Sequence, residues 1–110
     1  MAATVAGNAS AAELIMVRQR GCAWCALWDR EIGPIYPLSE EGRFAPLRPV
    51  DLGEPLPAYI EKPATITPTF ILVEDNHEID RIVGYPGDGF FWELLADMLN
   101  KTSFRRTPPS

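Results

Sequence analysis

The chain of 110 residues is long enough for one domain with a small hydrophobic core. Its 46% hydrophobic and 23% charged residues are the balance of an ordinary globular protein, and no apolar run is long enough to cross a membrane. The formal net charge of -5, without a basic stripe, excludes the usual means of binding nucleic acid, so we expect no nucleic-acid partner.

Both ends of the chain are poor in core-forming residues. Residues 1–12 are mostly small, and an Ala-Ser-Ala sequence within them has the form of a signal-peptidase site, although no apolar h-region precedes it. Two interpretations stay open for this segment: a flexible tail, or the remnant of an export signal. Residues 102–110 are predicted to form a flexible C-terminal tail. We therefore place the folded domain at residues 13–101.

The first predicted elements are a strand and a helix. Residues 13–19 (ELIMVRQ) carry four consecutive apolar side chains, which is typical of a strand buried on both faces. Gly21 ends this run, and from Cys22 onward apolar residues recur with helical spacing. The stripe of that helix consists of Cys25, Trp28 and Ile32. Gly33, followed by a proline, is predicted to end it.

The middle of the chain predicts shorter elements. Residues 35–42 are expected to be irregular or to form a short helical turn. A second strand is predicted at residues 47–51, and because Pro46 and Pro49 cannot donate to a ladder, this strand should be short or lie at an edge. Residues 56–61 predict one or two helical turns.

The last part of the chain predicts a hairpin and a helix. Residues 69–74 (TFILVE) form the strongest predicted strand, because they are mostly aromatic or β-branched. A turn at 75–77 leads into a strand at 78–83. Apolar spacing predicts a final helix over 89–100, with Asp88 as its N-cap. The order of elements predicts an α/β fold, a mixed four-stranded sheet with helices on both faces.

The only two cysteines, Cys22 and Cys25, admit three interpretations. A closed zinc site needs four ligands, and the sequence adds only His77, so we expect no metal. A structural clasp over so short a ring stabilises the fold by only about 2 kcal/mol. A redox pair needs a strand that delivers the first cysteine to the start of a helix, where a thiolate is stabilised. The predicted strand and helix provide that arrangement, so the pattern favours redox chemistry.

A second motif supports this interpretation. Thr67-Pro68 stands just before the strongest strand, and Pro68 lies 46 residues after Cys22. With CAWC at 22–25, a Val-Asp pair at the end of the second strand and Gly84 after the hairpin, the chain resembles the thioredoxin superfamily over residues 13–100. The resemblance implies that Pro68 is cis and packs against the cysteine pair. It also implies that Thr67 pairs through its backbone with a bound peptide and that Gly84 lines the same groove.

The resemblance implies a mechanism without any cofactor beyond the cysteine pair. Cys22, as a thiolate, attacks a partner disulfide or persulfide, and Cys25 resolves the mixed disulfide. Trp24 is expected to be exposed and to contact partners. Arg20 has two open interpretations, a stabiliser of the Cys22 thiolate or a solvent-facing side chain. The chain departs from thioredoxin at Met16, where that family has a buried aspartate.

The runs around the cysteine pair and from residue 67 onward (TPTFILVEDNHEIDRIVGYPGDGFFWELL) look like the periplasmic thioredoxins of the bacterial sulfur-oxidation (Sox) system. This resemblance implies an exported, monomeric reductase that keeps the cysteine of the Sox sulfur-carrier protein reduced and active. It also implies a membrane electron donor. Two alternatives stay open: a general periplasmic disulfide oxidase or isomerase, and a redox-inert binding module on the same fold.

Overall fold

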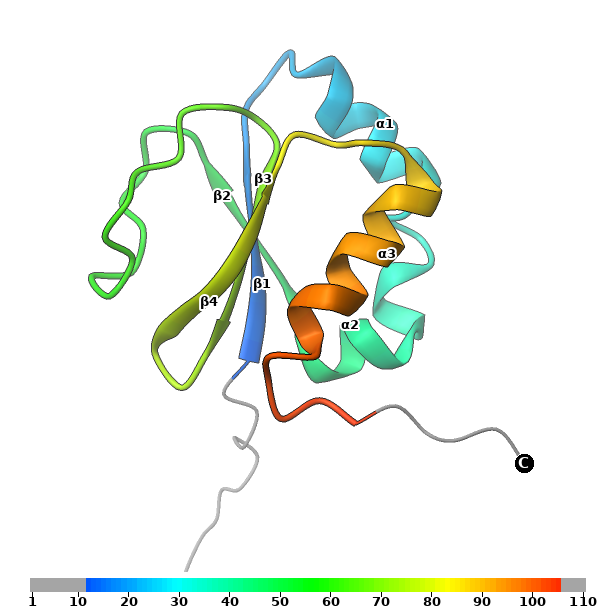
Figure 1. Cartoon of the computed structure of the whole chain (residues 1–110). Coiled ribbons are helices and arrows are strands. Elements are labelled where there is room, and N and C mark those ends of the chain that lie inside the picture. The colour runs from blue at the N-terminus through cyan, green and yellow to red at the C-terminus, as the bar shows by residue number, and fades with distance from the viewer. Residues whose placement is uncertain (1–11, 106–110) are drawn as a thin grey trace, which may run out of the picture.

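The computed structural model describes residues 12–105, and the predictions made for 1–11 and 106–110 lie outside the described residues. The elements in chain order are β1 (Ala12–Arg18), α1 (Ala23–Glu31), the 3₁₀ helix η2 (Tyr36–Leu38), α2 (Glu40–Phe44), β2 (Leu47–Asp51), β3 (Thr69–Glu74), β4 (His77–Val83) and α3 (Asp88–Leu99). Figure 1 shows the sheet with the helices packed beside it. No helix in residues 12–105 has the length and apolar character needed to span a membrane.

The strands form one mixed sheet in the order β2-β1-β3-β4, which confirms the predicted four-stranded α/β fold. β1 pairs in parallel with β2 and antiparallel with β3, and β3 pairs antiparallel with β4. β2, which contains Pro49, lies at an edge as predicted, where a missing amide donor costs least. β3 lies inside the sheet and is buried along nearly its whole length, as its continuous apolar run predicts.

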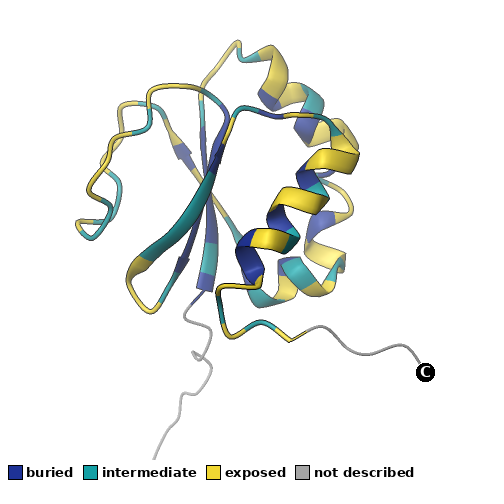
Figure 2. Cartoon of the chain, in the orientation of Figure 1, coloured by how far each residue is buried: buried dark blue, intermediate teal, exposed yellow. Residues whose placement is uncertain are grey.

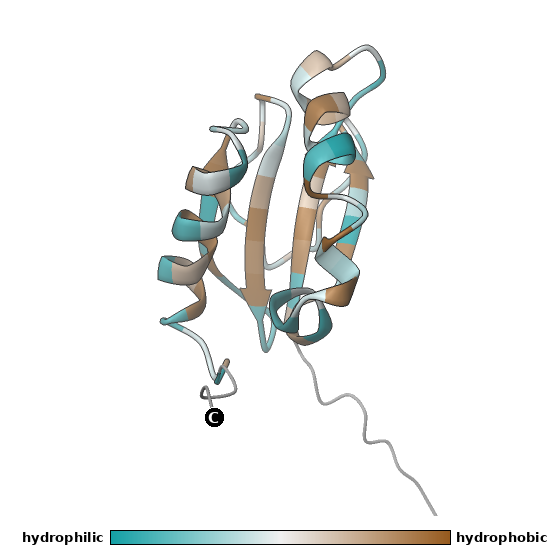
Figure 3. Ribbon diagram, turned by 90° about the vertical axis from the view of Figure 1, so that its right-hand side faces the viewer, coloured by the Kyte–Doolittle hydropathy of each residue, from teal (hydrophilic) through white to brown (hydrophobic). Residues whose placement is uncertain are grey.

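All helices of the described chain lie on one face of the sheet (Figures 1 and 3). In Figure 3, which looks onto this helical face, the strands behind the helices are hydrophobic. The core between them contains large buried side chains: Trp28, Tyr36, Phe70, Phe91, Leu95 and Leu99. Figure 2 shows the burial on the sides of α1 and α3 that face the sheet. The helical face therefore holds most of the core.

The prediction of helices on both faces is wrong for the second face. The buried residues of that face are Ile15, Val17, Val50, Ile71 and Val73. They are covered by the coil of residues 52–66, whose Leu56, Tyr59 and Ile60 are only partly buried. The helix expected at 56–61 does not form. Pro57 supplies no amide donor and disfavours helical backbone at Leu56, so a turn is as much as this segment adopts.

Several boundaries differ from the predicted ones by a residue or more. Ala12, expected in the N-terminal tail, is the first residue of β1. Phe104, expected in the C-terminal tail, packs edge-on against Phe44 with ring centroids 5.2 Å apart. α3 begins at Asp88, and its N-cap is Gly87, so Asp88 is not the cap. The Asp88 carboxylate accepts from the Gly89 amide at 2.6 Å, a local bond within the first turn.

Candidate active site

The cysteine pair lies at the start of α1, where the chain leaves β1. Gly21 has φ 81°, a left-handed conformation that glycine adopts without strain. Cys22 is the N-cap of α1, and its Sγ accepts a hydrogen bond from the Cys25 amide at 3.1 Å. The two cysteines form a disulfide with their Cα atoms 5.2 Å apart. When the pair is reduced, the same amide and the positive end of the helix stabilise a thiolate on Cys22.

The two cysteines differ in exposure. Cys25 lies on the buried stripe of α1 and is 1% exposed, whereas Cys22 is half-buried. Only the Cys22 sulfur is therefore accessible to another protein, as a nucleophile when the pair is reduced or as the attacked sulfur when it is oxidised. The buried stripe continues to Trp28, which is 1% exposed and packs on Phe70 and Phe91 at centroid distances of 5.4 and 5.9 Å. This packing fixes the helix that carries both sulfurs.

The other predicted site residues gather at the same end of the sheet. The Thr67–Pro68 peptide bond is cis, the isomer that the resemblance implies, and Pro68 is buried. Gly84 donates its amide to the Pro68 carbonyl at 2.7 Å, and Gln19 donates to the Thr67 hydroxyl at 3.2 Å. These bonds join the ends of β1 and β4 to the segment before β3. Their roles in binding stay predictions.

Three exposed apolar residues are next to these residues in the sequence. Trp24, between the two cysteines, is 59% exposed, as predicted. Ile66 precedes Thr67 and is 54% exposed, and Val83 precedes Gly84 and is 57% exposed. Sequence reasoning missed Ile66 and Val83, because an apolar residue next to a strand end looks like core until the fold exposes it.

Charged side chains also lie near the pair. A hollow beside Cys22 is lined by Arg18, Gln19, Arg20, Gly21, Cys22, Ala23, Ala26 and Asp51. Arg20 is exposed and forms no ion pair within residues 12–105, so its role in stabilising the thiolate stays a prediction. Arg18, which sequence reasoning missed, forms a bidentate ion pair with Asp29. Hydrogen bonding to Asp29 raises the pKa of Arg18, against the opposing effect of its burial.

Met16 occupies the position of the buried acid of thioredoxin. It is 0% exposed, and its sulfur lies 3.5 Å from Nη1 of Arg18. No group of three or more His, Cys, Asp or Glu side chains suited to a metal occurs among residues 12–105.

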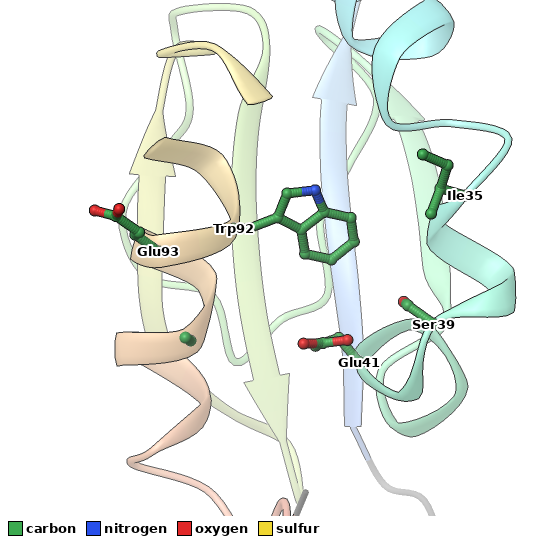
Figure 4. A pocket seen from close by; sticks show the side chains of 6 residues that line it. Ile35, Ser39, Glu41, Trp92 and Glu93 are labelled. Atoms are coloured by element: carbon green, nitrogen blue, oxygen red, sulfur yellow. The ribbon is translucent and has the colours of Figure 1, made fainter. Parts of the chain in front are cut away.

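A second hollow lies on the helical face, between α3 and the η2–α2 segment (Figure 4). It is lined by Ile35, Ser39, Glu41, Trp92, Glu93 and Ala96. The Trp92 indole projects from α3 toward the other wall and stacks on Tyr36 at 6.1 Å. Neither cysteine lines this hollow, so we assign it no part in thiol chemistry.

A mixed four-stranded sheet, a Cys-x-x-Cys disulfide at the start of the first helix and a cis proline at the same end define a thioredoxin-like thiol-disulfide oxidoreductase. The comparisons with known proteins agree. The chain is 44% identical to the periplasmic thioredoxin SoxS from Paracoccus pantotrophus in its reduced form. That match has a TM-score of 0.77 and covers 82% of this chain and 97% of that one.

Two further matches support the fold alone. The thioredoxin from Fasciola hepatica is 19% identical with a TM-score of 0.61, covering 81% of this chain and 82% of that one. A poplar thioredoxin h is 24% identical with a TM-score of 0.58, covering 84% and 80% respectively. No protein-family model and no curated protein sequence matches the chain. The chain belongs to the thioredoxin superfamily, in the family of the periplasmic thioredoxin SoxS.

Proposed function

We propose that this thiol-disulfide oxidoreductase is a periplasmic reductase that keeps the cysteine of the Sox sulfur-carrier protein reduced and active. The likeness to SoxS supports the Sox assignment. The observation that carries the chemistry is the difference between the two sulfurs: Cys22 at the helix start and accessible, Cys25 buried one turn inside. In this proposal the protein acts as a monomer, uses no cofactor beyond the pair, and receives electrons from a membrane donor.

The proposed reaction on a disulfide has two exchange steps. The Cys22 thiolate attacks one sulfur of the target disulfide, forming a mixed disulfide and releasing the other target sulfur as a thiolate. Cys25 then loses its proton and attacks the Cys22 sulfur, which releases the second target thiolate and closes the Cys22–Cys25 disulfide. Two electrons pass to the target. On a persulfide, Cys22 takes the outer sulfur and Cys25 expels it as hydrosulfide.

Target binding is proposed to use the backbone beside the pair. Within residues 12–105, the Thr67 amide and carbonyl make no hydrogen bond, so an extended peptide can pair with both. Pro68 and Gly84 complete this edge through the bond between them. The exposed Trp24, Ile66 and Val83 would each be available to contact apolar target side chains.

The proposal is tested by trapping the mixed disulfide. Reduced Cys25→Ser protein is mixed with the purified sulfur-carrier protein whose cysteine has been blocked as a disulfide. Because the resolving thiol is gone, a stable covalent complex is expected, and none is expected with Cys22→Ser. Wild-type protein should release the carrier in its reduced form.

The same variant decides between the alternatives. In a periplasmic extract, trapping of many folding secreted proteins, without the carrier, would favour a general oxidase or isomerase. If Cys22 is alkylated readily but no target is trapped or reduced, the reductase proposal is wrong and a redox-inert binding role is favoured.

A further inference from the structure

Arg18, which is paired with Asp29, lines the same hollow as Cys22, the residue of the proposed attacking sulfur. Arg18 is the last residue of β1, and Asp29 lies on α1 one turn after Cys25. Nη1 donates to Oδ1 at 2.8 Å and Nη2 to Oδ2 at 2.6 Å, so the guanidinium is held in a fork. The Arg18 side chain is 28% exposed and lines the hollow beside Cys22. The pair therefore joins the strand that leads to the cysteines to the helix that carries them.

Arg18 is an ordered cation at this site. The charged groups that line the hollow are Arg18 at the end of β1, Arg20 in the loop that follows, and Asp51 at the end of β2. Asp29 faces it only through Arg18, and the Ile66–Pro68 segment contributes no titratable side chain. Arg20 is exposed and forms no ion pair in the described part of the chain, so no salt bridge fixes its guanidinium beside Cys22. A cation in a fixed position stabilises a nearby thiolate more than one that samples solvent.

We propose that Arg18, held by Asp29, is a positioning residue that sets how readily the Cys22 thiol ionises. The inference rests on the proposed role of Cys22 as the attacking sulfur, but not on the identity of the target. The guanidinium favours the thiolate, and the Asp29 carboxylate offsets part of that positive charge.

The two partners should act in opposite directions. Arg18→Gln removes the cation and leaves the Asp29 charge, so the pKa of Cys22 should rise by about 0.5–1. Asp29→Asn leaves the guanidinium uncompensated, so the pKa of Cys22 should fall by about 0.5, roughly a threefold change in ionisation. A lower thiol pKa stabilises the reduced form, so Asp29→Asn should also be the more oxidising variant and Arg18→Gln the more reducing one.

The measurement follows the ultraviolet absorbance of the thiolate against pH in reduced protein, together with the pH dependence of alkylation at Cys22. The equilibrium with glutathione gives the change in redox strength. Arg48→Gln and Asp80→Asn are matched controls, because each removes the same charge from an ion pair elsewhere on the sheet. Neither control should move the Cys22 titration.

A purely structural ion pair gives a different result. Both variants would then lose stability, and both would leave the Cys22 pKa unchanged or shift it in the same direction, which overturns the proposal. If Arg18→Gln does not fold, Arg18→Lys is used, because it keeps the charge but cannot form the two parallel hydrogen bonds to Asp29. The pKa of Cys22 in this variant should rise above that of wild type, by less than the decrease of about 0.5 expected for Asp29→Asn. If the Cys22 pKa is unchanged in both Arg18→Lys and Asp29→Asn, the proposed role of Arg18 is wrong. If the two variants shift the Cys22 pKa in opposite directions but the wild-type protein does not reduce the Sox carrier, the proposed function is refuted and the role of Arg18 stands.

Discussion

The two faces of the sheet are covered in different ways. On the helical face, α1 and α3 bury an aromatic cluster in which Phe91 contacts Trp28 and Phe70 at ring-centroid distances of 5.9 and 5.0 Å. On the other face, the coil of residues 52–66 covers the strands with half-buried side chains such as Leu56. The first face has the packing of a domain core, and the second has a thinner cover.

The candidate active site contains residues from both the helical side and the coil-covered side of the sheet. Cys22 and Cys25 belong to α1, which is anchored in the aromatic core. Thr67 and Pro68 directly follow the coil of residues 52–66 that covers the other face. The sulfur chemistry is thus fixed by the strongly packed half, and the proposed peptide-binding segment is attached to the weakly packed half.

The largest expected effect comes from emptying the aromatic core. Phe91→Ala should lower the free energy of unfolding by about 3–5 kcal/mol, because Phe91 is 0% exposed and its neighbours cannot close the cavity. Leu56→Ala, the matched truncation on the coil side, should cost about 1–2 kcal/mol. Urea denaturation of both variants measures the difference. Equal losses would show that the two faces contribute alike.

Amide hydrogen exchange should separate the two halves in the wild-type protein. Within residues 53–66, the amides that donate to a backbone carbonyl are those of Glu54 and Ile60, whereas β3 is paired on both sides. Other coil amides should exchange at least about a thousandfold faster than those of β3, since they open without global unfolding. Strong protection throughout the coil would mean that the second face is as cooperative as the first.

Alkaline pH should weaken the helical face. Burial raises the pKa of Tyr36 above its ordinary value of 10.0, with a smaller effect from Glu41, and its hydroxyl donates to the Ala45 carbonyl at 2.7 Å. Below pH 10 the hydroxyl is neutral in both states. Above it, only the unfolded chain ionises freely, so stability falls as the pH rises.

Tyr36→Phe should cost about 1 kcal/mol near neutral pH, because the Ala45 carbonyl loses its donor. It should also lose less stability than wild type between about pH 10 and 11, because one of the groups responsible is gone. Thermal unfolding at several pH values checks both expectations. Parallel alkaline losses in the two proteins would refute the assignment to Tyr36.

The smallest effect is expected at the exposed ion pair between β4 and the end of α3. Lys101 Nζ lies 2.7 Å from Asp80 Oδ2, and this hydrogen bond is the main cause that lowers the pKa of Asp80. Lys101→Ala should cost less than about 1 kcal/mol, because both side chains are more than a third exposed. The difference should vanish as the pH falls through the lowered Asp80 pKa, where the carboxylate is protonated. Melting curves at neutral and acidic pH measure it.

Elements whose signals are local could be predicted from the amino-acid sequence alone. The bounds of β2 and β3 agree with the predicted 47–51 and 69–74, because each follows from a run of strand-forming residues and its flanking breakers. The helical period after Gly21 likewise placed Cys25 and Trp28 on the buried side. The cysteine pair at a helix start could be inferred for the same reason.

Features that depend on residues far apart in the chain became visible only in the folded structure. The coil of residues 52–66 covers the second face because strand pairing places an apolar surface beside it. Its prolines prevent it from doing so as a helix. Arg18 pairs with Asp29, eleven residues later in the sequence, because α1 packs over the end of β1. Such a meeting depends on how the helix packs on the sheet, and no local propensity encodes that distance.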